Sequence, residues 1–148
     1  MSSNPVYAIF ATPKSFGPFI LRMLLAAIFF YHGGQKAFGL FGGPGWSVTL
    51  QKWSANGFPA GVTVAVMLTE ILVCIAMFFG FLTRLASLGV IVVMAGALHY
   101  VHVSKGFESS EFPLSLLMVA LALFFLGGGR LSMDRMISGQ LLPTIGGY

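Results

Sequence analysis

The sequence predicts an all-α integral membrane protein: a four-helix bundle with both termini in the cytoplasm and a short interfacial helix in the first outer loop. Of its 148 residues, 57% are hydrophobic and only 8% are charged, whereas an average soluble domain carries about 25% charged residues. The mean hydropathy is +0.90. The apolar residues form four runs, each close to the ~20 residues that cross a bilayer as a helix. The runs do not alternate with polar residues as barrel strands do, so helices must satisfy the backbone hydrogen bonds.

The four runs predict membrane helices over residues 16–36, 62–82, 85–103 and 112–126. Ser15 is a candidate N-cap for the first helix, and Ser109 and Ser110 are candidates for the fourth because serine side chains accept hydrogen bonds from free N–H groups. The membrane domain is therefore expected to cover residues 16–130, and 131–148 form a cytoplasmic C-terminal tail.

Residues 1–13 lack a basic n-region and a long apolar h-region, so we expect residues 1–15 to be a cytoplasmic tail rather than a cleaved signal peptide. An even number of spans places both termini on one side. The side of the termini carries more cations than the other side, and the cations on the other side are accompanied by acids. This excess favours a cytoplasmic location of the termini. The inner set is Lys14, Arg22, Arg84, Arg130 and Arg135, and the outer set is Lys36, Lys52 and Lys105 with Glu108 and Glu111.

Two shorter helices are expected outside the spans. In "WSVTLQKW", Trp46, Leu50 and Trp53 share one helical face, and tryptophan prefers the headgroup level, so this segment is predicted to lie on the outer membrane surface. An ordinary packed loop is the alternative. After the fourth span, Ser132 could cap a short cytoplasmic helix that continues to Met136.

Glu70 is the clearest candidate for a functional residue. It lies eight residues into the second predicted span, about 12 Å below the outer surface at the helical rise of ~1.5 Å per residue. A carboxylate at that depth is expected to be protonated or paired with a cation.

The other spans contribute polar groups to the same outer half of the bilayer. Lys36 ends the first span, and His32 lies one turn deeper on the same face. We expect an inward-facing cluster in which Lys36 neutralises Glu70 and histidines bridge the helices. Within it, Glu70, His99 and His32 are candidate catalytic residues, and the candidate ligand-binding residues are Lys36, Gln35, Glu111 and His102.

Such a cluster could instead fix only the helix register, or, as a further alternative, hold a metal or haem. The "HYVH" pair at 99–102 offers two imidazoles, but the Glu-x-x-His pairs of di-iron bundles are missing, so neither metal nor haem is expected. Arg22, deep in the inner half without an acid nearby in sequence, is expected to reach toward the cytoplasmic headgroups. The eight Lys and Arg residues are scattered and form no basic patch, so no nucleic-acid partner is expected.

In order and spacing, these features resemble the DoxX family of small four-span bacterial inner-membrane proteins. The likeness covers roughly residues 16–135. It includes "HGGQKAFG" at the end of the first span, "GFLTR" at 80–84 and "GGGRLSMD" at 127–134, together with Arg22, Glu70, His99 and Glu111. The resemblance implies a multi-pass protein of the bacterial inner membrane, tied to quinone-linked redox chemistry.

Three functions remain open from the sequence. The first is a quinone-associated redox subunit, since quinone reduction needs proton donors and an apolar slot; quinone is then the cofactor, and electrons come from a partner because the sequence has no evident electron-carrier motif. The second is a structural accessory subunit of a larger respiratory or photosynthetic complex. The third is a small-molecule channel or transporter, although the sequence shows no inverted repeat. The expected partners are the lipid bilayer and either other subunits or further copies of this chain.

Overall fold

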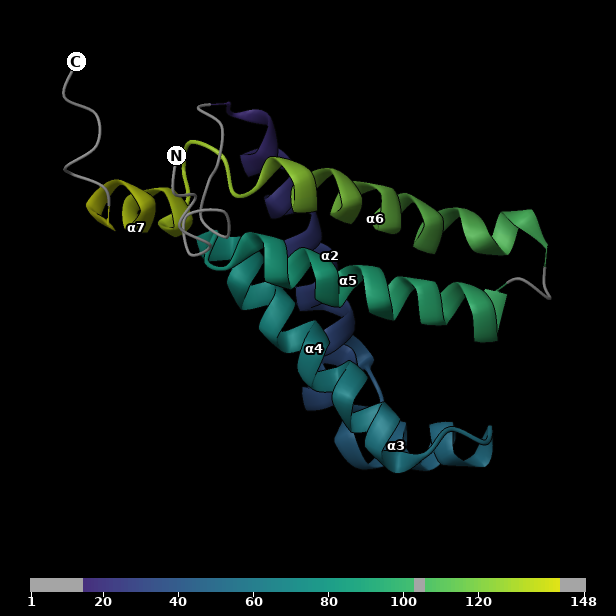
Figure 1. Cartoon of the computed structure of the whole chain (residues 1–148). Coiled ribbons are helices and arrows are strands. Elements are labelled where there is room, and N and C mark those ends of the chain that lie inside the picture. Colours follow the sequence, from purple (N-terminus) through teal and green to yellow (C-terminus); the bar gives the residue numbers. More distant parts are fainter. Residues whose placement is uncertain (1–14, 103–105, 142–148) are drawn as a thin grey trace, which may run out of the picture.

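The computed structural model describes residues 15–102 and 106–141, and the regular elements of this described part are all helices (Figure 1). Four of the helices are long and apolar enough to cross a membrane. They are α2 (Gly17–Phe38), α4 (Ala60–Phe79), α5 (Thr83–Ala97) with the start of the π-helical segment η2 (Leu98–His102), and α6 (Phe107–Leu126). The predicted four-span membrane fold is confirmed. The cytoplasmic location of the termini stays a prediction.

Three shorter elements complete the described chain. The 3-10 turn η1 (Leu40–Gly42) and helix α3 (Gly45–Ala55) lie between α2 and α4, and helix α7 (Met133–Leu141) follows α6. The surface-helix segment predicted from "WSVTLQKW" is therefore helical. The Ser132 hydroxyl accepts the N–H of Arg135 at 3.3 Å, which confirms its predicted capping role, and α7 continues five residues beyond Met136.

The helix bounds differ from the prediction by a few residues at several ends, and two of these differences have a clear local cause. Helix α6 begins at Phe107, with Gly106 before it, so Ser109 and Ser110 lie inside the helix and are not its N-caps. Helix α4 ends at Phe79 because Gly80 (φ 65°) and Leu82 (φ 49°) adopt left-handed conformations, which turn the chain directly into α5.

Neighbouring helices pack in chain order: α2 against α4, α4 against α5, and α5 against α6, with α2 also touching α6. The shared core is apolar; it includes Leu25, Phe29, Val73, Met77, Val90, Leu116, Ala120 and Leu123. Large side chains on the outer surfaces of the spans, such as Leu72, Val92 and Phe125, are 64% to 71% exposed. A bilayer would cover these side chains with lipid.

The two ends of the bundle differ. At the end where α7 lies, the N–H of Arg130 donates to the carbonyl of Ser15 at 3.0 Å, and α4 meets α5. Toward the opposite end α4 and α5 diverge (Figure 1). There the ring of Phe58, between α3 and α4, contacts Tyr100 of η2 at a centroid separation of 6.0 Å. The two ends are called here the α7 end and the α3 end.

Candidate functional site

An ion pair joins α2 and α4 near the α3 end. The Nζ of Lys36, in the last turn of α2, lies against Oε1 of Glu70, in the middle of α4. The side chain of Glu70 is 3% exposed and that of Lys36 is 24% exposed. A β-carbon at Gly33 would lie 3.3 Å from that of Glu70, so the glycine allows α2 to approach the carboxylate-bearing face of α4 closely.

The second oxygen of the Glu70 carboxylate has no hydrogen-bond partner among the described residues. Oε2 is buried, and no group in the described part of the chain donates to it. A buried acceptor without a donor costs roughly 1–3 kcal/mol. Glu70 can therefore accept a proton or a hydrogen bond from a ligand without breaking its contact with Lys36.

Helix α3 covers the lysine end of this pair. The Thr49 hydroxyl lies 3.1 Å from the carbonyl oxygen of Lys36 and 2.7 Å from that of Gly45, and Thr49 is buried. The ring of Trp53 lies 5.6 Å from Lys36 Nζ, within the range of a cation–π interaction. The surface helix thus holds both the backbone and the ammonium group of Lys36.

The histidines stand around the pair without bridging it. His32 is half-buried one turn before Lys36, and its ring lies 6.0 Å from that of Phe112 on α6. His99 is exposed in η2, with its ring 4.7 Å from Tyr100. Within the described residues neither imidazole hydrogen-bonds to Glu70, so His32 and His99 do not bridge the helices through Glu70 in this structure.

The remaining candidate residues lie further out. Gln35 is half-buried on α2, and Glu111 is exposed on α6, where no ion pair involves it among the described residues. The side chain of His102 lies outside the described residues. In the same described part of the chain, no three His, Cys, Asp or Glu side chains are grouped closely enough to hold a metal ion.

An aromatic chain nevertheless connects His99 to the ion pair. It runs from Trp53 to Phe58 at 5.4 Å and from Phe58 to Tyr100 at 6.0 Å between ring centroids. Its far end, Tyr100, lies in a π-helical segment, a distortion that often marks functional sites. The segment between α3 and α4 therefore links the Lys36 end of the site to the end of α5.

A second polar cluster, at the α7 end, was not predicted. Arg22 is fully buried; its guanidinium donates to the carbonyl of Met77 at 2.8 Å and to that of Leu131. The expectation that Arg22 reaches the headgroups was therefore wrong, because α4 and the chain that follows α6 each supply a carbonyl acceptor to its side chain. A β-carbon at Gly80 would lie only 2.2 Å from Nη1 of Arg22.

Asp134 completes this cluster from the first turn of α7. Its carboxylate accepts the N–H of Leu82 at 2.6 Å and the N–H of Thr83 at 2.8 Å, so it caps α5 from another helix. Asp134 is 1% exposed. One feature of the sequence could have indicated this cluster. Arg22 in the first span and Asp134 after the last span are opposite charges at the same end of the bundle.

Comparisons with known proteins agree with this architecture. The DoxX family model matches residues 17–103. The chain is 28% identical over 127 residues to "Putative oxidoreductase CatD" of Bacillus subtilis (strain 168), covering 84% of this chain and 90% of that protein. It is 29% identical over 133 residues to an uncharacterized protein of Haemophilus influenzae, covering 84% and 85%. No solved structure matches significantly. The family match spans more than half of a multi-pass membrane protein with the expected four helices, and the chain therefore belongs to the DoxX family.

Proposed function

We propose that this protein is the membrane subunit of a quinone-linked redox system of the bacterial inner membrane, and that Glu70 exchanges protons with the quinone. The observation that carries the proposal is the Glu70 carboxylate. It is buried in the middle of a membrane helix, one oxygen is paired with Lys36, and the other has no partner in the part of the chain that the structure describes. The oxidoreductase name of the Bacillus subtilis relative supports a redox role.

The chemistry requires both protons and electrons. A quinone takes up two electrons and two protons to become a quinol, with one proton on each carbonyl oxygen. In this proposal a partner protein with a flavin or haem centre supplies the electrons. Glu70 delivers one of the two protons to a carbonyl oxygen within hydrogen-bond reach, and water supplies the proton of the other carbonyl oxygen. The ammonium of Lys36 stabilises the Glu70 carboxylate that remains.

The other polar residues have supporting roles in the proposal. His32, one turn from Lys36 and half-buried, reprotonates Glu70 from the α3 end. His99, exposed in η2, exchanges protons with the outer aqueous phase, and Gln35, His102 and Glu111 bind the polar part of the ligand as it enters.

The decisive experiment replaces Glu70 by glutamine in the native membrane, with the partner proteins present. We expect Glu70→Gln to lower quinone-linked electron transfer by about 100-fold or more, as loss of a general acid does, while the protein stays inserted. Glu108→Gln is the matched control, since Glu108 is exposed in the first turn of α6 and outside the proposed site. If Glu70→Gln and His99→Gln together leave a co-purifying complex fully active, the chain is an accessory subunit instead.

A further inference from the structure

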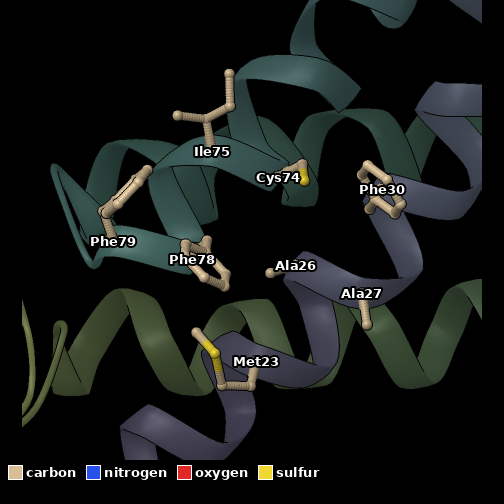
Figure 2. A pocket seen from close by; sticks show the side chains of 8 residues that line it. All are labelled: Met23, Ala26, Ala27, Phe30, Cys74, Ile75, Phe78 and Phe79. Carbon is tan, nitrogen blue, oxygen red and sulfur yellow. The ribbon is translucent and has the colours of Figure 1, made fainter. Parts of the chain in front are cut away.

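An apolar groove of about 440 Å³ opens on the surface between α2 and α4 (Figure 2). Met23, Ala27 and Phe30 line it from α2, and Cys74, Ile75 and Phe78 line it from α4. Phe30 and Phe78 are 53% and 59% exposed, so the groove opens to the lipid side of the bundle. Its volume falls within the roughly 300–1,000 Å³ of known ligand pockets.

One end of this groove, at Cys74, lies one helical turn from Glu70 of the ion pair. Phe30 and Cys74 lie at one end of the groove and Met23 and Phe78 at the other (Figure 2). Glu70 is one helical turn from Cys74, about 6 Å along α4. A ligand chain lying in the groove can therefore place its head beside the carboxylate.

The depth of the Cys74 end of the groove in the bilayer determines which kind of ligand headgroup can reach it. Glu70 lies in the middle of α4, a membrane-spanning helix, whereas the charged headgroup of a phospholipid stays at the membrane interface. A neutral ring with carbonyl oxygens can enter the hydrocarbon layer and still accept hydrogen bonds. It would meet there two donors, the ammonium of Lys36 and the hydroxyl that Glu70 presents when Oε2, unpaired within the described residues, carries a proton.

We propose that the groove between α2 and α4 binds the isoprenoid tail of a quinone whose ring lies at Lys36 and Glu70. This inference rests on the proposed function, and it adds the side of the bundle from which the quinone approaches and the residues that hold its tail. Small side chains create the space, because Ala26 and Ala27 stand where α2 faces the phenylalanines of α4.

The test is photocrosslinking in nanodiscs, with a ubiquinone or menaquinone analogue that carries a diazirine on its tail, followed by mass spectrometry. We expect labels on the groove residues, above all Met23, Ala27 and Phe78. Ala27→Phe should fill the groove and lower the labelling about tenfold. Ala95→Phe makes the same change at an exposed position of α5 and should leave the labelling unchanged.

Two results would overturn the inference. One is tail labelling of the wild-type protein that maps to α5 and α6 rather than to the groove. The other is equal labelling of the groove by a diazirine phospholipid that excess quinone does not displace, which would make the groove a general lipid site. These experiments need no electron donor. Loss of activity in Glu70→Gln with no groove labelling would retain the proposed function and reject this site, and groove labelling with full Glu70→Gln activity would do the reverse.

Discussion

Asp134 of α7 caps helix α5 through the N–H groups of Leu82 and Thr83, so the chain after the last membrane span fastens the turn between the second and third spans. Three segments that carry the family resemblance meet there: Arg22, "GFLTR" at 80–84 and "GGGRLSMD" at 127–134. The motif residues therefore divide into a structural cluster at the α7 end and the Lys36–Glu70 pair near the α3 end.

The first prediction concerns this cap. Asp134→Ala removes both acceptors and should destabilise the protein by about 1–3 kcal/mol, because the buried N–H of Thr83 and the partly buried N–H of Leu82 lose their partner. Asp134→Asn keeps one acceptor oxygen and should fall between the wild type and the alanine variant. Thermal unfolding in detergent measures the order. Equal midpoints for Asp134→Ala and the wild type would show that the cap does not limit stability.

The second prediction compares two glycines with positive φ. Gly80 has a φ of 65° and Gly57 a φ of 85°, so alanine at either position costs about 1–2 kcal/mol of backbone strain. A β-carbon at Gly80 would also collide with the Arg22 guanidinium, whereas nothing lies within 4 Å at Gly57. Gly80→Ala should therefore lower the unfolding midpoint clearly more than Gly57→Ala, and equal shifts would contradict the observed packing of Arg22.

The sequence predicted the membrane helices well because hydropathy reports directly which segments lipid can surround. It predicted the start of α6 poorly for the same reason. The turn from Phe107 to Glu111 is polar and lies outside the apolar run, but it is helical. Hydropathy locates the part of a helix that lipid covers, and backbone hydrogen bonds decide where the helix ends.

The two clusters differed in how far the sequence could reveal them. Lys36 could be matched with Glu70 because opposite charges at similar depth in hydrocarbon need each other. The partners of Arg22 are backbone carbonyls of Met77 and Leu131, which have no signature in a sequence. His99 was expected to face inward, but the π-helical turn leaves it exposed, and no local pattern indicated that turn.

The third prediction concerns the cover over Lys36. Trp53→Leu removes the aromatic face near the ammonium, an interaction of about 0.5–2 kcal/mol, and should lower quinone-linked activity by loosening Lys36. Trp53→Phe keeps a ring and should retain most of the activity. Trp46→Leu, on the same surface helix and 38% exposed, is the control. An equal loss in Trp46→Leu would mean that α3 acts through membrane attachment rather than through Lys36.

The last prediction tests whether the Lys36–Glu70 pair is a coupled unit. Lys36→Met leaves the buried Glu70 carboxylate without its cation and should destabilise the protein by about 3–5 kcal/mol. Glu70→Gln removes the charge but keeps a hydrogen-bonding side chain, so its cost should be smaller. The double variant Lys36→Met/Glu70→Gln contains no buried charge and should be clearly more stable than Lys36→Met alone. Thermal unfolding of the four proteins in detergent gives the coupling energy as a double-mutant cycle. Strictly additive effects would mean that the two side chains contribute to stability independently. The ion pair with Lys36 would then no longer support the proposal that Glu70 exchanges protons.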